Sequence, residues 1–210
     1  LLCHPALKSL FASLVAVDAV YSLDESVPGE NWDCWVPPLS LPFLCGTQFT
    51  TIPAELPYLQ ATEEHCSRWR GRLPEEGLRV GLAWKGNPRF ENDAQRSLPS
   101  LSLLASLGQV GGVSFISLQK GAGEEEALSP PAGLPLLALG HEITDFADSA
   151  AILQQLDLII SVDSALAHLA GALGKPCWVL LPDYMTDWRW LKERSDSPWY
   201  PDVMRLFRQP

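Results

Sequence analysis

Short, almost uninterrupted apolar runs alternate with amphipathic segments along most of this chain. Runs with the length and composition of buried β-strands lie at residues 78–84, 113–119, 157–162 and 177–181. A weaker strand and a final strand or extended segment are predicted at 134–140 and 203–208. Segments with helical character lie at 62–73, 98–108, 149–156, 164–173 and 187–194. This alternation predicts an α/β fold with a doubly wound, Rossmann-like parallel sheet.

Several helix boundaries carry their own signals. Thr62 stands where an N-cap is expected, immediately before the segment EEHCSRWR. Gly108 is expected to end the helix over 98–108. Gly174 and Pro176 follow the helix over 164–173 in the order typical of a helix C-terminus.

The first 60 residues follow a different pattern. Residues 1–23 predict a strand end, a helix from about Pro5 and a strand over 17–23. A lone β-α-β unit cannot cover both faces of a parallel sheet, so we expect it to be the remnant of a preceding domain. The chain is therefore divided into a remnant with its connection, residues 1–60, and a main domain, residues 61–210.

The connection between these parts, residues 27–59, is rich in proline and aromatic residues and has no clean period. Irregular segments of this length are often functional. The alternative is a structural linker packed by Trp32 and Trp35.

Composition and charge narrow the classes of partner. The chain has 210 residues, of which 47% are hydrophobic and 19% charged, as in one large globular domain or one domain with part of another. Lys and Arg number 15 against 25 Asp and Glu, for a formal net charge of -10. This acidic balance argues against a nucleic-acid backbone as the main partner, because such binding needs clustered cations.

Cysteine usage and apolar run lengths bear on the compartment. The five cysteines are scattered without a CxxC pair, which favours reduced thiols over a disulfide framework or a zinc site. No apolar run reaches the ~18 residues that a membrane span needs. The chain opens on Leu1 without a charged lead-in, so we expect no signal peptide and interpret it as a fragment of a longer cytoplasmic protein.

A polar step separates the apolar strand over 157–162 from the apolar helix that follows it, in the stretch SVDSALAHLAGALGKP. Free N–H groups and the positive end of the helix dipole make such a place an anion site. Ser164 adds a hydroxyl, and His168, one turn on, is expected to face the same ligand. Asp163 is a good N-cap, but it could instead hold a ribose hydroxyl or orient a neighbour. The alternative is an ordinary Asp-Ser cap and a core histidine.

Isolated cations strengthen the anion-site interpretation. Lys120 is the only Lys or Arg between Arg96 and Lys175, and it closes the strand over 113–119. Its side chain either contacts a phosphate or neutralises part of the negative charge of the acidic residues nearby. A turn at Gly86, Asn87 and Pro88 follows the strand over 78–84. Three cations lie near it in the sequence: Lys85, Arg89 and Arg96.

The ends of three predicted strands therefore meet in one crevice that carries cations and amide donors. Neither GxGxxG nor GxxxxGK[ST] occurs in the chain. A dinucleotide oxidoreductase or a P-loop ATPase is thus disfavoured.

At these residues the chain resembles the C-terminal, donor-binding half of GT-B glycosyltransferases. The resemblance is closest to bacterial proteins that fuse tetratricopeptide repeats to a domain like the lipopolysaccharide heptosyltransferases. The O-linked N-acetylglucosamine transferases are more distant relatives. Its most specific part is the Asp-Ser-x-x-x-His step followed by Leu-Ala-Gly and Gly-x-Pro. The matching pieces are VGLAWKGNPRFENDAQRSLP, FISLQKG, DFADSAAILQQLDLIISVDSALAHLAGALGKPCWVLLP and DWRWLKERSDSPWYPDVMRLFRQ.

The resemblance implies a nucleoside-diphosphate sugar as donor. The amides of Ser164 and Ala165, with His168, would contact its diphosphate, and Lys120 or Arg96 would neutralise the charge. Heptosyltransferases usually have Gly where this chain has Ala165. The segment from Asp145 would lie near the base. The full expected donor-binding set is Lys85, Gly86, Asn87, Arg96, Gln119, Lys120, Asp145, Phe146, Ala147, Asp163, Ser164, Ala165 and His168.

In metal-free GT-B enzymes, amides, a helix dipole and basic side chains stabilise the leaving diphosphate. The chain has no Asp-x-Asp motif, so we expect neither a metal nor another cofactor. The resemblance places the general base in the N-terminal half, so no catalytic residue is assigned. Expected partners are the donor, a glycan, lipid or protein acceptor, the preceding half and tetratricopeptide repeats.

Two other functions stay open at this point. One is a nucleotide-sugar epimerase on the same scaffold, which would need acid/base carboxylates and a histidine facing the sugar within one complete two-domain chain. The other is a non-catalytic interaction module with a vestigial anion site. In that module an aromatic group near the C-terminus would pack against a partner or the missing domain. Alternatively, these aromatic side chains pack against other residues of the same chain. The group consists of Trp188, Trp190, Trp199 and Tyr200.

Overall fold

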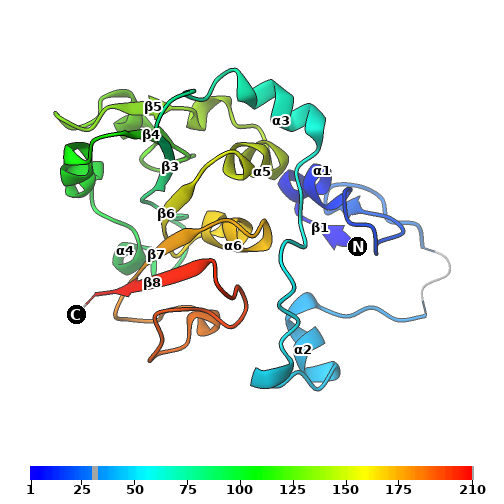
Figure 1. The fold of residues 1–210 in the computed structure, drawn as a ribbon. Helices are drawn as coiled ribbons and strands as arrows, with labels where there is room; N and C mark the ends of the chain where they lie inside the picture. Colours follow the sequence, from blue (N-terminus) through cyan, green and yellow to red (C-terminus); the bar gives the residue numbers. More distant parts are fainter. Residues whose placement is uncertain (30–32, 210) are drawn as a thin grey trace.

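The computed structural model of the protein describes residues 1–29 and 33–209. Its main feature is a six-stranded sheet in which every neighbouring pair of strands is parallel. In sheet order the strands are β5 (Leu136–Ala138), β4 (Val113–Ser117), β3 (Leu78–Ala83), β6 (Leu158–Val162), β7 (Cys177–Leu181) and β8 (Met204–Arg208). Successive strands are added in one direction from β3 and in the other from β6, so the predicted doubly wound fold is confirmed (Figure 1).

The sheet is buried on both faces, as its continuous apolar strands require. Successive residues of a strand point to opposite faces. Phe115 belongs to the core on one face, together with Val80, whereas Ile116 belongs to the core on the other face. That second core includes residues of α5 (Phe146–Gln154) and α6 (Ala165–Ala172).

Three of the predicted helices form where expected. The helix α3 (Glu63–Arg70) begins after Thr62, whose side chain accepts a hydrogen bond from the His65 N–H. The helices α5 and α6 connect β5 to β6 and β6 to β7. Gly174, with φ of 66°, follows α6 in the left-handed conformation that glycine adopts readily.

The segment predicted as a helix over 98–108 forms a 3-10 helix, η4 (Leu101–Gln109), and Gly108 lies inside it. A Cβ at Gly108 would lie 1.7 Å from the carbonyl oxygen of Gly133. The glycine is therefore required for a close approach of two backbones, and the helical segment ends one residue beyond it, at Gln109. The short helix α4 (Asp93–Arg96) precedes this segment.

The prediction of a helix over 187–194 is wrong. Only one 3-10 turn forms there, η7 (Trp188–Trp190). Leu191 follows it with φ of 54°, a left-handed conformation that stops a helix. The Arg208 guanidinium accounts for this, because it donates hydrogen bonds to the carbonyls of Trp190 and Leu191, at 2.9 and 2.7 Å.

The N-terminal segment forms a separate β-α-β unit, as expected, with shorter strands than predicted. β1 (Leu2–Cys3) pairs in parallel with β2 (Tyr21–Ser22) in a two-stranded sheet of its own. Between them lies α1 (Lys8–Phe11). Leu10 is only 2% exposed and belongs to the main core.

In the described part of the connection, residues 27–29 and 33–59, the regular elements are short helical turns. They include α2 (Leu41–Leu44), which Figure 1 shows away from the six-stranded sheet. Trp35 is 85% exposed, so the interpretation of a linker packed by this residue is wrong. Trp32 lies outside the described residues. The other 3-10 helices are η1 (Pro5–Leu7), η2 (Pro38–Ser40), η3 (Phe49–Thr51), η5 (Glu124–Leu128) and η6 (Gly140–Glu142).

Within residues 1–29 and 33–209, no helix combines the length and hydropathy that crossing a bilayer requires. The same ranges contain no group of three or more His, Cys, Asp or Glu side chains placed to hold a metal ion. All five cysteines are free thiols.

Candidate functional site

A cavity of about 620 Å³ opens at the carboxyl edge of the sheet, where the strand order reverses between β3 and β6. Ligands of doubly wound proteins bind at this topological position. Expected donor-binding residues that line the cavity are Lys85, Gly86, Asn87, Arg96, Gln119, Lys120, Asp145, Phe146, Ser164 and Ala165. Ala147, Asp163 and His168 are not among the lining residues.

Register explains why three loops converge here. Ala83, the last residue of β3, is paired with Ser161 of β6, and Leu82 is paired with Ser117 at the end of β4. The three strands therefore end at nearly the same level. The loops that follow them open onto one space.

The start of α6 forms one wall of the cavity. Ser164 is the N-cap, and its hydroxyl accepts a hydrogen bond from the Leu166 N–H at 3.3 Å. Asp163, the other candidate, is not the cap. Ala165 is the first residue of α6, and its side chain is exposed. First-turn N–H groups without intrahelical acceptors, together with the dipole, attract an anion.

The Arg96 guanidinium is held beside this helix start. Its Nη1 donates to the Asp163 carbonyl oxygen at 3.2 Å, and its Nε donates to the Asp93 carboxylate at 3.2 Å. It also lies 4.4 Å from the centre of the Phe90 ring. These contacts fix a cation next to the α6 N-terminus in the cavity.

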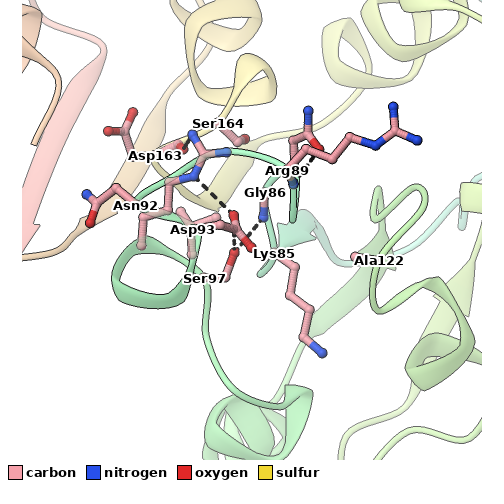
Figure 2. Close-up of polar contacts among 12 residues, drawn as sticks. Lys85, Gly86, Arg89, Asn92, Asp93, Ser97, Ala122, Asp163 and Ser164 are labelled. Carbon is pink, nitrogen blue, oxygen red and sulfur yellow. Dashed lines mark hydrogen bonds and ion pairs between the residues drawn. The ribbon is translucent and has the colours of Figure 1, made fainter.

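Glycine at position 86 makes room for this arginine. A Cβ at Gly86 would lie 2.5 Å from Arg96 Nη2. The Gly86 N–H donates to Ser97 Oγ at 2.8 Å, and Ser97 in turn donates to Asp93 (Figure 2). The turn after β3 and the end of α4 are therefore tied together around the guanidinium.

The other cations of this turn point elsewhere. Figure 2 shows the side chains of Lys85 and Arg89 extending away from Ser164. Lys85 forms an ion pair with Glu126 at 2.5 Å. Burial opposes ionisation of the Glu126 carboxyl, but hydrogen bonds from Lys85 and the Leu101 N–H outweigh it and lower its pKa. Lys85 thus serves mainly to balance a local charge.

Gln119 shapes the cavity wall. It is 2% exposed, and its Oε1 accepts hydrogen bonds from the Trp84 and Lys85 N–H groups, both at 2.9 Å. Its Nε2 donates to the carbonyls of Lys85 and Ala122, at 3.0 and 2.8 Å. The side chain therefore joins the loops after β3 and β4. Lys120, the next residue, is exposed at the rim and donates to the Gly140 carbonyl at 3.2 Å.

The start of α5 forms the opposite wall. Asp145 is the N-cap and accepts hydrogen bonds from the N–H groups of Ala147 and Asp148, at 2.9 and 3.0 Å. Phe146 lines the cavity, whereas Ala147 is buried beneath it. Apolar lining from Leu118 and Ile143 adds to this side.

His168 faces a buried cluster next to the cavity, so the expectation that it shares a ligand with Ser164 is not met. Its ring stacks on Trp190, with ring centres 4.8 Å apart and planes inclined by 14°. Its Nδ1 lies 3.0 Å from the Tyr200 hydroxyl oxygen. Burial lowers the pKa of His168, while Asp187 and Asp163 act in the opposite direction. The ring is therefore neutral near neutral pH.

Asp163 takes the orienting role that sequence reasoning left open. Its Oδ1 accepts a hydrogen bond from the Trp190 indole at 2.8 Å, and its Oδ2 accepts one from the Asp187 N–H at 3.4 Å. Trp190 is fully buried, and Tyr200 is 6% exposed. Trp190 and Tyr200 of the C-terminal aromatic group therefore pack within this chain, as the self-packing alternative predicted.

Sequence reasoning missed several residues around the cavity. Ala6 of the N-terminal unit lines it, as do Phe90 and Thr144. Phe90 is signalled only by its place between two arginines. Ala6 carries no signal, because an isolated alanine gives no indication of a contact so distant in the chain.

Comparisons with known proteins point to one family. Residues 103–180 match the model for glycosyltransferase family 9 (heptosyltransferase). Protein FlbA of Caulobacter vibrioides is 30% identical over 164 residues, which cover 72% of this chain and 26% of FlbA.

Two solved structures share the fold. Escherichia coli ADP-heptose lipopolysaccharide heptosyltransferase II has a TM-score of 0.51 and 20% identity, over 77% of this chain and 48% of that one. The glycosyl transferase family 9 protein of Veillonella parvula has a TM-score of 0.51 and 14% identity, over 72% and 43%. The chain thus has the Rossmann-like fold of GT-B heptosyltransferases, and it spans about a quarter of FlbA and under half of either enzyme.

Proposed function

We propose that this chain is the donor-binding part of a metal-independent GT-B glycosyltransferase and that its cavity takes a nucleoside-diphosphate sugar. One observation carries most of the proposal: Arg96, fixed by Asp163 and Asp93, lies in the same cavity as the N-terminus of α6. The family match over residues 103–180 supports the same reaction class. We propose as well that the whole protein has a preceding GT-B half and tetratricopeptide repeats. Its acceptor would be a glycan, a lipid or a protein, and its location would be the cytoplasm.

In this assignment the diphosphate lies between the first turn of α6 and Arg96. Negative charge grows on the leaving diphosphate as the sugar is transferred, and fixed N–H groups, a helix dipole and a guanidinium stabilise it. Lys120 at the rim adds a second cation. The apolar side of the cavity, with Leu118, Ile143 and Phe146, suits the nucleotide base.

The general base that accepts the proton of the acceptor hydroxyl has no assigned residue. Both carboxylate oxygens of Asp163 accept hydrogen bonds, from the Trp190 indole and the Asp187 N–H, which fits an orienting role better than proton transfer. His168 faces Trp190 and Tyr200. The proposal therefore leaves the base to a part of the protein that precedes this chain.

Titration of ADP, GDP and UDP by calorimetry tests the proposal. We expect one nucleotide to bind preferentially, and Arg96→Ala to weaken its affinity roughly 10- to 150-fold, because a hydrogen bond to a charged group contributes about 1.5–3 kcal/mol. Arg89→Ala is the matched control, because Arg89 extends away from Ser164 and should leave the affinity nearly unchanged.

Two results would contradict the proposal. The first is the absence of binding by all three nucleotides in a folded sample, which would favour an interaction module. The second is an equal loss of affinity in both arginine variants, which would indicate nonspecific attraction by surface charge.

A further inference from the structure

A second cavity, of about 760 Å³, lies at the same edge of the sheet, beyond the ends of β7 and β8. The segment that follows β7 forms most of its wall. Residues that line it include Asp183, Tyr184, Met185, Asp187, Trp188 and Lys192. The proposed donor site does not involve these side chains.

Asp163 and Asn92, which line neither cavity, connect the residues around the two. The carbonyl oxygen of Asp163 accepts a hydrogen bond from Arg96 of the first cavity, whereas its carboxylate accepts one from the N–H of Asp187 in the second. Asn92, which is 3% exposed, donates to the carbonyls of Tyr184 and Met185, at 2.9 and 3.2 Å. A ligand in the second cavity would therefore lie close to the anion site.

The aromatic surface of the second cavity is held in place before any ligand arrives. Trp188 is 52% exposed, and it meets Trp199 edge to face, with ring centres 5.3 Å apart. The Arg189 guanidinium lies 4.6 Å from the Trp188 ring centre and pairs with the Asp187 carboxylate at 2.9 Å. An indole fixed in this way loses little side-chain entropy when a flat apolar surface packs on it.

The backbone of this wall is fixed as well. Met185 and Leu191 have φ of 52° and 54°, in the left-handed region that costs free energy for residues other than glycine. Hydrogen bonds from Asn92 to the Met185 carbonyl and from Arg208 to the Leu191 carbonyl hold this conformation. The wall is thus a preformed surface.

The polar groups of the cavity carry both signs of charge. Asp183 supplies a carboxylate and Lys192 an ammonium, and both are exposed. The lining carries two carboxylates, Asp183 and Asp187, and two cations, Lys192 and Arg208, so it has no excess of positive charge that would favour a second phosphate or another polyanion. A neutral ring with hydroxyl groups fits better, because hydroxyls donate to carboxylates and accept from ammonium groups, while the C–H face packs on an aromatic ring.

We propose that the second cavity is a carbohydrate subsite, in which a saccharide ring packs on Trp188 and its hydroxyls bond to Asp183 and Lys192. The assignment rests on the proposed glycosyl transfer, which requires a sugar beside the diphosphate. The saccharide is either the glycosyl group of the donor or the terminal sugar of the acceptor.

Fluorine NMR of protein labelled with 5-fluorotryptophan tests this subsite. Trp188→Phe identifies the Trp188 signal by its disappearance. The probes are the methyl glycosides of glucose, galactose, mannose, N-acetylglucosamine and a heptose. We expect at least one to shift the Trp188 signal saturably, with an affinity reduced at least threefold by Lys192→Ala. The signal of Trp35, which is 85% exposed elsewhere on the chain, should not move and serves as the control.

Titrations with the nucleoside diphosphate that binds the first cavity and with its sugar conjugate distinguish the two sources. A shift caused by the conjugate, absent with the diphosphate and competed by free glycoside, assigns the cavity to the donor sugar. A shift caused by free glycoside to the same extent with and without bound conjugate assigns it to the acceptor.

The subsite is overturned if neither the glycosides nor the conjugate moves the Trp188 signal, or if Trp35 moves in parallel with it. Failure of the proposed function is distinguishable from this result. If the proposed function fails while the subsite exists, no nucleotide binds the first cavity. Glycosides still shift the Trp188 signal, and Lys192→Ala still weakens their binding.

Discussion

At the scale of single residues, His168 shows how a burial site decides the role of a titratable group. Its ring packs against both Trp190 and Tyr200, where a positive charge would lose its hydration. Burial lowers its pKa despite two nearby carboxylates, Asp187 and Asp163. The folded protein therefore resists protonation of this ring more strongly than the unfolded chain does.

This pKa shift predicts a loss of stability in acid. An unfolded histidine has a pKa of about 6.5, so above that pH both states hold a neutral ring and the free energy of unfolding is unaffected. As the pH falls below about 6.5, the unfolded state binds the proton first, and stability decreases by up to about 1.4 kcal/mol per pH unit. The loss ceases below the lowered folded pKa of His168.

Urea unfolding of the wild type and His168→Gln from pH 8 to pH 5 measures this effect. The other titrating groups are common to both proteins and cancel in the difference. The stability advantage of the wild type should shrink as the pH falls. An advantage that stays constant or grows would show that the ring is not held neutral by the fold.

At the scale of elements, the two helices that begin at the carboxyl edge both start with a side-chain cap. Asp145 caps α5 and Ser164 caps α6. A cap fixes the first residue of a helix and so decides which N–H groups face the edge. These two residues thereby position opposite walls of the first cavity.

The α5 cap is testable by substitution. Asp145→Ala removes the acceptor for the N–H groups of Ala147 and Asp148 and should lower the free energy of unfolding by about 1–2 kcal/mol. Asp145→Ser keeps a capping oxygen and should lose less, as measured by urea unfolding. If both variants lost the same free energy, the cap would not be the cause.

At the scale of the whole molecule, the N-terminal unit and the main sheet share one core. Leu10 of α1 and Leu59 of the connection belong to the same core as residues of α5, and α1 contacts α5 directly. Ala6 of the same unit reaches the first cavity. The division at residue 60 stays a prediction, but the packing implies that both parts unfold together.

Leu10→Ala should therefore destabilise the whole chain by about 2–5 kcal/mol, because it leaves a cavity in the shared core. Leu39→Ala, at a residue that is 72% exposed, should change stability by no more than about 0.5 kcal/mol. Thermal unfolding followed by circular dichroism measures both. A separate early transition in Leu10→Ala, with the main transition unmoved, would show that the N-terminal unit folds independently.

The sequence by itself determined the strands of the large sheet, the helices α3, α5 and α6 and the edge at which polar residues collect. These features depend on contacts between near neighbours in the chain, through apolar runs, caps and the glycine after α6. The helix predicted over 187–194 failed because Arg208, from the last strand, holds the carbonyls of Trp190 and Leu191.

Only the tertiary structure decided which polar side chains face the cavity. Arg96 is placed there by Asp163, whereas Lys85 is drawn to Glu126 and His168 to Trp190 and Tyr200. Each of these partners comes from a distant part of the chain. A local pattern shows that a residue is charged or aromatic, but its direction depends on which partner burial brings within reach.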